Sequence, residues 1–212
     1  NSKFKEKKFV WGTEESLAAR IVLNDIKSNF KSYESLRLLD IGCGYGRDVN
    51  YFRNNGLDAM GIDNSGEAIL LGKEQWPDLC LEERDIFDYQ IDDKLDIVYC
   101  NFFIHLFLED QRKIIIDKIY GMLNKNGVAY FITSSDQDED YRKGKAIGDH
   151  LIVNERGVMK YYYNEDSIKK EFQIFDRIEI NTFSEMHTHD YLHEHINYVI
   201  KCIKQGDKIQ RC

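Results

Sequence analysis

Three glycines alternate with other residues directly after an apolar run that contains an acid. Residues 38–46 read LLDIGCGYG, in which Asp40 stands two positions before the first glycine. Glycine has no Cβ, so a ligand can approach the main chain closely and the backbone can adopt positive φ. A carboxylate ahead of such a turn repels phosphate and attracts a cationic or hydroxyl-bearing ligand. The segment therefore predicts a small-molecule site built largely from main-chain atoms.

A second acid, Asp63, follows the apolar residues Met60 and Ile62. It lies about twenty residues beyond the first glycine, the spacing of a strand–turn–helix–strand unit whose second strand presents an acid to a ribose diol. A dinucleotide site expects G-x-G-x-x-G, but Arg47 stands where the third glycine of that motif would be. A dehydrogenase therefore stays a rival interpretation, which binding of NADH would test.

Apolar periodicity indicates the elements that must hold these residues. We expect strands at 36–41, 58–62, 79–84, 95–100 and 128–133, and helices at 14–30, 46–55, 66–75 and 109–123. Thr13 and Ser65 are the expected N-caps of the first and third helices. Alternating strands and helices imply a doubly wound, mainly parallel sheet, whose ligands lie beyond the carboxyl ends of its strands. This rule selects the glycine turn, Asp63, Asp85 and residues 101–105.

The chain after residue 133 follows a different pattern. Residues 134–160 are polar and glycine-punctuated, with one short apolar run at 151–153. A helix near 164–172 and strands at 174–182 and 196–203 would complete the fold. About thirteen residues join those two strands, which favours an antiparallel hairpin over a parallel crossover.

The pattern D-x-G-x-G-x-G at 40–46, together with Asp63 and the CNFFIHL segment at 100–106, resembles class I S-adenosylmethionine-dependent methyltransferases. The resemblance covers about residues 36–203. It implies an α/β fold, a Rossmann-like doubly wound seven-stranded sheet, mainly parallel, with a C-terminal antiparallel hairpin. It also implies S-adenosylmethionine as the cofactor. The residues that it assigns to cofactor binding are Trp11, Asp40, Gly42, Cys43, Gly44, Asp63, Asn64, Asp85, Ile86 and Asn101.

The implied roles differ within this set. The glycine turn would hold the methionine portion, with Asp40 acting through the turn or on the cofactor's amino group. Asp63 would accept both ribose hydroxyls, and Asp85 with the backbone N–H of Ile86 would bind adenine. The aromatic face of Trp11 would attract the sulfonium. Plainer alternatives are a helix cap for Asp63, a turn for Asp85 and a core anchor for Trp11.

His105 is the first candidate on the acceptor side. In relatives with this pattern a histidine often faces the substrate here, and a pKa near neutrality would suit a general base. The alternative is a buried histidine that is wedged among Phe103, Leu106 and Phe107 and donates to a backbone carbonyl.

Residues 140–145, DYRKGK, resemble a Tyr-Gly-x-Gly stretch of small-molecule methyltransferases of the tellurite-resistance type. Arg142 replaces the first glycine of that stretch. We expect Tyr141 to be catalytic, and Arg142 and Lys145 to bind a carboxylate, phosphate or phosphonate acceptor. A solvated charge run explains the same residues.

Four of the six histidines fall within residues 187–195, HTHDYLHEH. We expect a catalytic role for His189 and substrate binding by His187, His193 and His195. Ligation of zinc or iron is chemically feasible for such residues but less favoured, and the prediction is that the protein holds no metal. Alternating histidines on one face of an exposed, extended segment are the plainest alternative.

Composition sets the outer limits. The 212 residues suit one domain, with an N-terminal helical cap at 1–35 and a lid at 134–163. A net charge of −8 argues against a nucleic-acid surface, and no apolar run is long enough for a membrane span. A basic start without an apolar signal region predicts a cytoplasmic protein. Five scattered cysteines without a C-x-x-C pair indicate neither a disulfide framework nor a thiolate zinc site.

The sequence therefore predicts a methyltransferase that acts on a small polar, anionic metabolite, by in-line displacement and with oxygen as the acceptor atom. Transfer to nitrogen, sulfur or a metalloid stays open, as do the oligomeric state and the identity of the general base. The rivals are an NAD-dependent dehydrogenase and a non-catalytic cofactor-binding protein.

Overall fold

The computed structural model describes residues 9, 11–154, 156–188 and 192–206. The α-helices are α2 (Leu17–Asn29), α3 (Arg47–Asn54), α4 (Gly66–Gln75), α5 (Glu109–Met122) and α6 (Glu165–Glu171), and two short 3₁₀ helices are η1 (Ile104–Leu106) and η2 (Glu139–Arg142). The strands are β1 (Arg37–Ile41), β2 (Asp58–Asp63), β3 (Leu81–Glu83), β4 (Leu95–Asn101), β5 (Leu123–Ser134), β6 (Lys145–Gly148), β7 (Leu151–Val153), β8 (Met159–Tyr161), β9 (Arg177–Thr188) and β10 (Leu192–Ile203).

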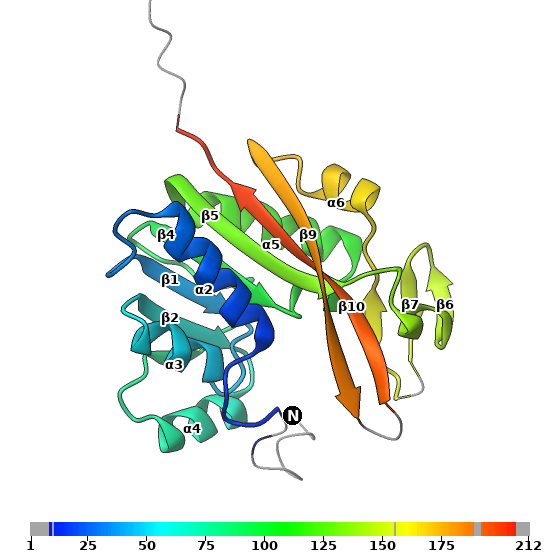
Figure 1. The fold of residues 1–212 in the computed structure, drawn as a ribbon, viewed down its shortest axis with the longest axis horizontal. Coiled ribbons are helices and arrows are strands. Elements are labelled where there is room, and N and C mark those ends of the chain that lie inside the picture. Colours follow the sequence, from blue (N-terminus) through cyan, green and yellow to red (C-terminus); the bar gives the residue numbers. More distant parts are fainter. Residues whose placement is uncertain (1–8, 10, 155, 189–191, 207–212) are drawn as a thin grey trace, which may run out of the picture.

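Seven strands form one sheet in the order β3-β2-β1-β4-β5-β10-β9 (Figure 1). The pairs from β3 to β5 are parallel, whereas β10 is antiparallel to both of its neighbours. Strand order reverses between β1 and β4, and ligands of such sheets bind beside this reversal. The predicted fold class is confirmed.

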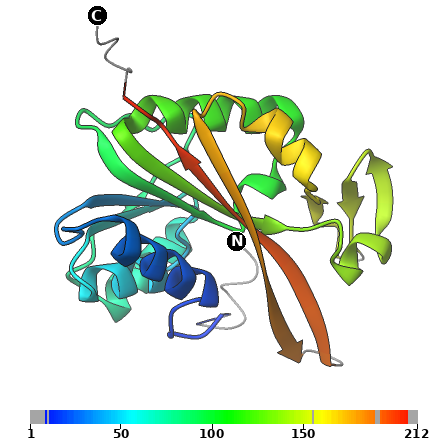
Figure 2. The same cartoon turned by 45° about the horizontal axis from the view of Figure 1, so that its top comes forward.

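Helices cover both faces of the sheet. α2, α3 and α4 lie on one face and α5 and α6 on the other, as Figures 1 and 2 both show. Central strands are therefore buried on both sides and read as continuous apolar runs. In β4, Ile97 and Tyr99 join the core under α2 and α3, while Val98 and Cys100 join the core under α5.

The first helix begins at Leu17, three residues later than the expected start at residue 14. Ser16 is its N-cap, and the Ser16 hydroxyl accepts a hydrogen bond from the N–H of Ala19 at 3.0 Å. The prediction for Thr13 was wrong because Ser16 also bonds to the distant Asp48, a contact that helical periodicity does not reveal. Ser65 caps α4 as predicted.

The C-terminal strands are longer than predicted. They pair without interruption from Arg177↔Ile203 to Thr188↔Leu192, so most of the histidine-rich segment lies within the hairpin and not in a connection. The histidines alternate with polar residues, which leaves no apolar pattern to mark the strands.

A second sheet, β6-β7-β8, occupies residues 145–161, of which only 151–153 were expected to be extended. Figures 1 and 2 show β6 and β7 outside the main sheet, near the end of β5 where the chain leaves it.

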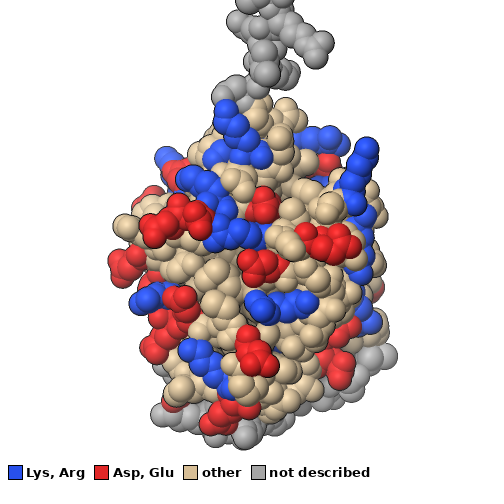
Figure 3. Space-filling model, turned by 90° about the vertical axis from the view of Figure 1, so that its left-hand side faces the viewer, with Lys and Arg blue, Asp and Glu red and all other residues tan. Residues whose placement is uncertain are grey.

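The charged surface is mixed. Lysine and arginine side chains intermingle with aspartate and glutamate on the face drawn in Figure 3. Among the described residues, no helix combines the length and apolar character that a bilayer span requires.

Candidate functional site

The glycine turn between β1 and α3 is held against the neighbouring strand. Gly42, Gly44 and Gly46 have φ of 78°, 58° and 82°, which L side chains rarely adopt. The N–H groups of Gly42 and Cys43 both donate to the carbonyl of Ile62, at 2.8 and 3.1 Å. A Cβ on Gly42 would also collide with the ring of Phe103. The turn thus requires glycine for its conformation and for its close packing.

Asp63 ends β2 beside this turn. One of its carboxylate oxygens accepts from the N–H of Gly44 at 2.9 Å, and the other from the N–H of Ser65 at 2.8 Å. The two backbone donors fix the carboxylate at the carboxyl end of the sheet. The predicted juxtaposition of the turn and this acid is present.

A crevice opens where β1, β2, β3 and β4 end. It is lined by Ile41, Gly42, Ile62, Asp63, Asn64, Arg84, Asp85, Ile86, Phe103 and Phe107. Five residues assigned from sequence therefore meet here: Gly42, Asp63, Asn64, Asp85 and Ile86. Sequence reasoning missed the aromatic wall, in which the rings of Phe103 and Phe107 lie 4.8 Å apart. The signal for it is the run of aromatic residues directly after β4.

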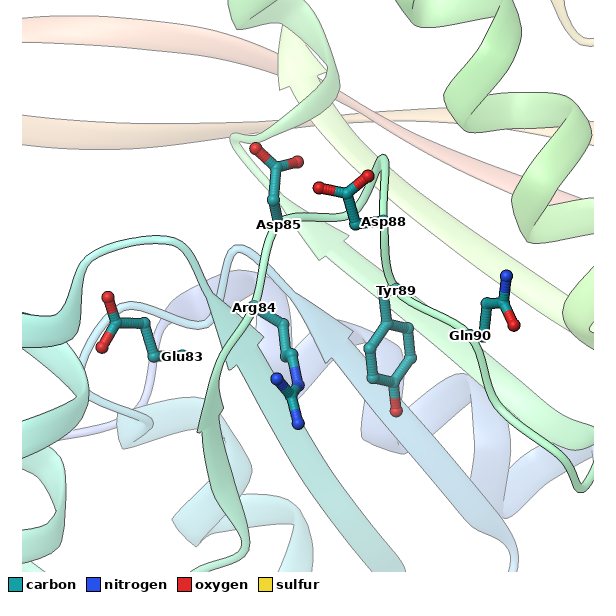
Figure 4. Close-up of a pocket in the computed structure, with 6 residues that line it drawn as sticks. All are labelled: Glu83, Arg84, Asp85, Asp88, Tyr89 and Gln90. Carbon is teal, nitrogen blue, oxygen red and sulfur yellow. The ribbon is translucent and has the colours of Figure 1, made fainter.

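An acidic rim flanks the crevice. A neighbouring hollow is lined by Glu83, Arg84, Asp85, Asp88, Tyr89 and Gln90. Figure 4 shows the carboxylates of Asp85 and Asp88 on the same side of the loop, with Arg84 and Tyr89 on the other. Asp85 is exposed and accepts a hydrogen bond from the N–H of Phe87 at 2.9 Å, which shapes the loop.

Asp40 lies buried in β1 below the turn. Burial raises its pKa well above the usual value, and the nearby carboxylates of Asp48 and Asp63 raise it further. Its Oδ1 atom accepts no hydrogen bond from any described residue. The half-buried Cys43 lies in the turn itself, and burial raises the pKa of its thiol. That thiol is therefore a neutral part of the wall at ordinary pH.

A buried carboxylate that sequence reasoning missed connects three elements. Asp48 of α3 accepts from the N–H of Ser16 at 2.8 Å, from the Ser16 hydroxyl at 2.7 Å, and from the Tyr99 hydroxyl and the Asn101 amide, both at 3.2 Å. An acid in the first turn of a helix normally indicates a solvated charge. The available signal is that Asp48 stands four residues before Phe52 and so shares its buried face.

Residues 11–16, the N-terminal strap, are bound to the turn. The Trp11 N–H donates to the Tyr45 hydroxyl at 3.1 Å, and that hydroxyl donates to the carbonyl of Gly12 at 2.6 Å. Arg47 donates to the carbonyl of Trp11. The ring of Trp11 stacks on Tyr45 and lies 3.9 Å from the position a Cβ on Gly44 would take. Trp11, which is 50% exposed, is thus placed beside the turn, as its assignment requires.

The pKa of His105 lies below the near-neutral value that we expected from the sequence. It is 1% exposed in η1, and burial, with the charge of Lys160 second, lowers its pKa to about 3. Its Nδ1 lies 3.0 Å from the Thr133 hydroxyl and 3.5 Å from the N–H of Ser134. Since that N–H can only donate, Nδ1 is an acceptor and the proton of the neutral ring resides on Nε2. The expected donation to a backbone carbonyl is not what Nδ1 does.

The cationic segment lies on η2 and β6, away from the crevice lining. Arg142 and Lys145 are exposed. Tyr141 packs on the ring of His150 at 5.7 Å and on that of Tyr162 at 5.4 Å. These contacts fix Tyr141 of η2 beside the second sheet.

The four histidines near the C-terminus are described to different extents. His189 lies outside the described residues, and only the backbones of His187 and His193 are described, paired across the hairpin. His195 is described in full, and its Nδ1 lies 2.9 Å from a carboxylate oxygen of Asp138.

The His195–Asp138 pair is set firmly in place. The same Asp138 oxygen accepts from the N–H of Ile196 at 3.0 Å, and the other oxygen accepts from the N–H of Asp140 at 2.8 Å. The hydrogen bond that the ring of His195 donates to Asp138 raises the pKa of His195. The charges of Asp138 and Asp140 add to this, while burial and the charge of Lys160 oppose it. Burial alone would raise the pKa of Asp138, but the hydrogen bond from His195 and those from the backbone hold it below its usual value.

Together with Asp140, the pair also forms a group that could hold a metal ion. Asp138, Asp140 and His195 offer ligand atoms within 4.8 Å of one another. However, both Asp138 oxygens already accept hydrogen bonds from N–H donors, two of them from the main chain.

Arg112 of α5 joins the second sheet to the crevice loop. It makes a two-pronged ion pair with Glu171, at 2.7 and 2.9 Å, and donates to the carbonyl of Phe107 at 3.0 Å. Its guanidinium also lies 3.9 Å from the centre of the Tyr161 ring. Sequence reasoning missed this residue because an arginine in an amphipathic helix normally indicates the solvated face.

Sequence comparison identifies a relationship over the first half of the sheet. Residues 39–129 match the family model of a methyltransferase domain. Uncharacterized methyltransferases from Bacillus thuringiensis and Bacillus cereus are 27% identical over 124 residues and 26% identical over 140 residues. The alignments cover 56% and 63% of this chain but only 58% and 64% of those relatives, less than two thirds of their length.

Solved structures extend the likeness to nearly the whole chain. A SAM-dependent methyltransferase from Methanosarcina mazei superposes with a TM-score of 0.71 at 17% identity, covering 86% of this chain and 98% of its own. The 1,6-didemethyltoxoflavin-N1-methyltransferase of Burkholderia thailandensis, solved with bound 1,6-didemethyltoxoflavin and S-adenosylhomocysteine, superposes with a TM-score of 0.69 at 16% identity, covering 97% of this chain and 85% of its own. These likenesses confirm the methyltransferase fold that the glycine motif predicts.

Proposed function

We propose that this protein transfers the methyl group of S-adenosylmethionine to a small polar acceptor. The observation that carries the proposal is a pair of buried oxygens, Asp40 Oδ1 and Asn101 Oδ1, that accept no hydrogen bond within the described part of the chain. Buried polar atoms are normally paired, so the two call for a donor. The ammonium of a methionine moiety is such a donor, and its charge would offset the cost of ionising the buried Asp40.

The neighbouring crevice suits the same ligand. Asp63 is held by two backbone donors and still has lone pairs for a ribose diol. Asp85 and the N–H of Ile86 would bind adenine, against the rings of Phe103 and Phe107. The face of Trp11 beside Gly44 would stabilise a sulfonium. Asn64 would add polar contact, and the backbone of Cys43 would complete the turn.

When bound, the cofactor would supply a methyl group on a sulfonium, whose carbon the acceptor atom attacks in line with the C–S bond while the sulfur leaves as a neutral thioether. The contribution of this chain is to align the two reacting atoms and to exclude water. Alignment of this kind is worth on the order of 7–11 kcal/mol in well-ordered systems. The buried ends of β4 and β5 and the second sheet beside them would provide the enclosure.

We place the acceptor between the end of β5 and residues 134–163, which would form the lid. The exposed cations Arg142 and Lys145 on this segment support a small anionic metabolite, with oxygen as the acceptor atom, in the manner of the tellurite-resistance type. His195 has the properties of the general base, because Asp138 orients its ring and makes it more basic. His105 would instead be a neutral hydrogen-bonding group. Tyr141, His187, His189 and His193 keep the roles expected for them as proposals.

The cofactor assignment is tested by calorimetry with S-adenosylhomocysteine and, separately, NADH. We expect binding of the first ligand alone, and its loss in Asp63→Ala. Asp58→Ala is the matched control, since Asp58 is an exposed carboxylate at the other end of the same strand. Unchanged affinity of Asp63→Ala would refute the ribose assignment, and binding of NADH in place of the first ligand would refute the function.

A further inference from the structure

The amide of Asn101 stands at the junction of β4 and the glycine turn. In the parallel register Asp40 lies opposite Tyr99, so continuing it by two residues brings Asn101 beside Gly42. Successive residues of a strand alternate between faces, which puts Asp40, Tyr99 and Asn101 on the same face of the sheet. That face is the one covered by the N-terminal end of α2.

The orientation of this amide is set by hydrogen bonds from its NH₂ group, because its oxygen has no described donor. Asn101 Nδ2 donates to an oxygen of Asp48 at 3.2 Å and to the Ser16 hydroxyl oxygen at 3.3 Å. A flipped amide would direct its oxygen at the Asp48 carboxylate, which has no proton to give and would repel it. Asn101 Oδ1 is therefore directed away from Asp48, where no described residue donates to it.

The carboxylate is itself held in one position. Its other oxygen accepts from the main-chain N–H of Ser16 at 2.8 Å, a donor that cannot rotate or change character. The hydroxyls of Ser16 and Tyr99 add two further donors to the oxygen that Asn101 uses. Asp48 is buried at 4% exposure, so water does not compete for these bonds.

We propose that Asp48 is a positioning residue that makes Asn101 present an oxygen, and not an NH₂ group, to the ammonium end of the cofactor. The inference rests on the proposed function, because it takes S-adenosylmethionine as the ligand of the crevice. In this proposal Asp48 does not contact the ligand. It determines whether the ammonium of the ligand faces the partly negative oxygen or the partly positive NH₂ group of Asn101. Through Ser16 it also ties that choice to the N-terminal strap.

The substitution Asp48→Asn tests this with little change in volume. The fixed N–H of Ser16 still requires an acceptor, so the new amide turns its oxygen toward Ser16 and its NH₂ toward Asn101. Asn101 must then flip to accept that donor, and its own NH₂ faces the ammonium. The result is a repulsion confined to the amino-acid end of the ligand.

Two ligands separate this effect from a general loss of structure. S-adenosylhomocysteine carries the ammonium, whereas 5′-methylthioadenosine keeps the adenosine and the thioether but lacks the amino-acid group. By calorimetry we expect Asp48→Asn to weaken the first at least about tenfold and the second by no more than about twofold. Asp58→Asn, the same change at an exposed site, should alter neither. The double variant Asp48→Asn/Asn101→Asp restores an oxygen facing the ammonium and should recover most of the affinity.

Each outcome bears on the inference. Equal weakening of both ligands, or no change in either, overturns it while leaving the proposed function in place. If Asp48→Asn does not fold, Asn101→Ala gives the same test, and unchanged affinity for S-adenosylhomocysteine overturns the inference. A wild-type protein that binds neither ligand refutes the proposed function, and the inference falls with it.

Discussion

Protonation of His105 should make the protein sensitive to mild acid. An unfolded histidine has a pKa of about 6.5, whereas burial lowers that of native His105 to about 3. Between about pH 3 and about 6.5, His105 binds a proton in the unfolded chain but stays neutral in the native protein. The stabilising contribution is thus complete above about pH 6.5 and is lost as the pH falls toward 3.

The size of the effect follows from this difference. Each pH unit is worth at most about 1.4 kcal/mol, so between pH 7 and pH 5 the proton should cost the native state about 2 kcal/mol. The comparison is with His105→Asn, whose side-chain oxygen takes a place close to that of Nδ1 and can accept from Thr133. Both proteins are unfolded in urea at several pH values and followed by circular dichroism.

The expected result is a difference in unfolding free energy, wild type minus variant, that falls by about 2 kcal/mol from pH 7 to pH 5. Acidic and basic groups elsewhere are common to the two proteins and cancel. Parallel stability curves would show that the native ring accepts the proton freely, and the reasoning from its burial would then be wrong. His105 would in that case regain its standing as a base.

Two further predictions concern the other titrating groups of the site. Binding of S-adenosylhomocysteine should release a proton from Asp40 in mildly acidic buffer, because burial raises the pKa of Asp40 and a nearby ammonium favours its charged form. Binding heats that do not depend on the ionisation enthalpy of the buffer at any pH would contradict this, and Asp40→Asn is the control. His195 should titrate above its ordinary pKa in an NMR experiment and shift downward in Asp138→Asn, and an unmoved value would remove Asp138 as its partner.

Local patterns in the sequence were sufficient for the first half of the sheet. The glycine turn and Asp63 are bound to each other through neighbouring backbone groups, so their spacing along the chain carries most of the geometry. The apolar runs of β1 and β4 likewise identify strands buried on both faces.

Contacts between distant residues were beyond such patterns. Asp48 bonds to Ser16 across 32 positions, and His195 to Asp138 across 57. The sequence marks neither acid, since only the folded chain shows that each is buried against a specific donor. The pKa of His105 was misjudged for the same reason, because it depends on burial against β5 and on the charge of Lys160 of β8.

The N-terminal strap has a consequence for how sequences of this kind can diverge. The side chains of Tyr45 and Arg47 hydrogen-bond to backbone groups of the strap, namely the N–H of Trp11 and the carbonyls of Trp11, Gly12 and Glu14. Every amino acid except proline has both of these backbone groups. Side chains at positions 13 and 14 are therefore free to drift between species without loosening the attachment. Tyr45 and Arg47 contribute side chains to the contact and cannot be replaced in this way. Sequence variation should therefore concentrate on the strap and spare these two residues.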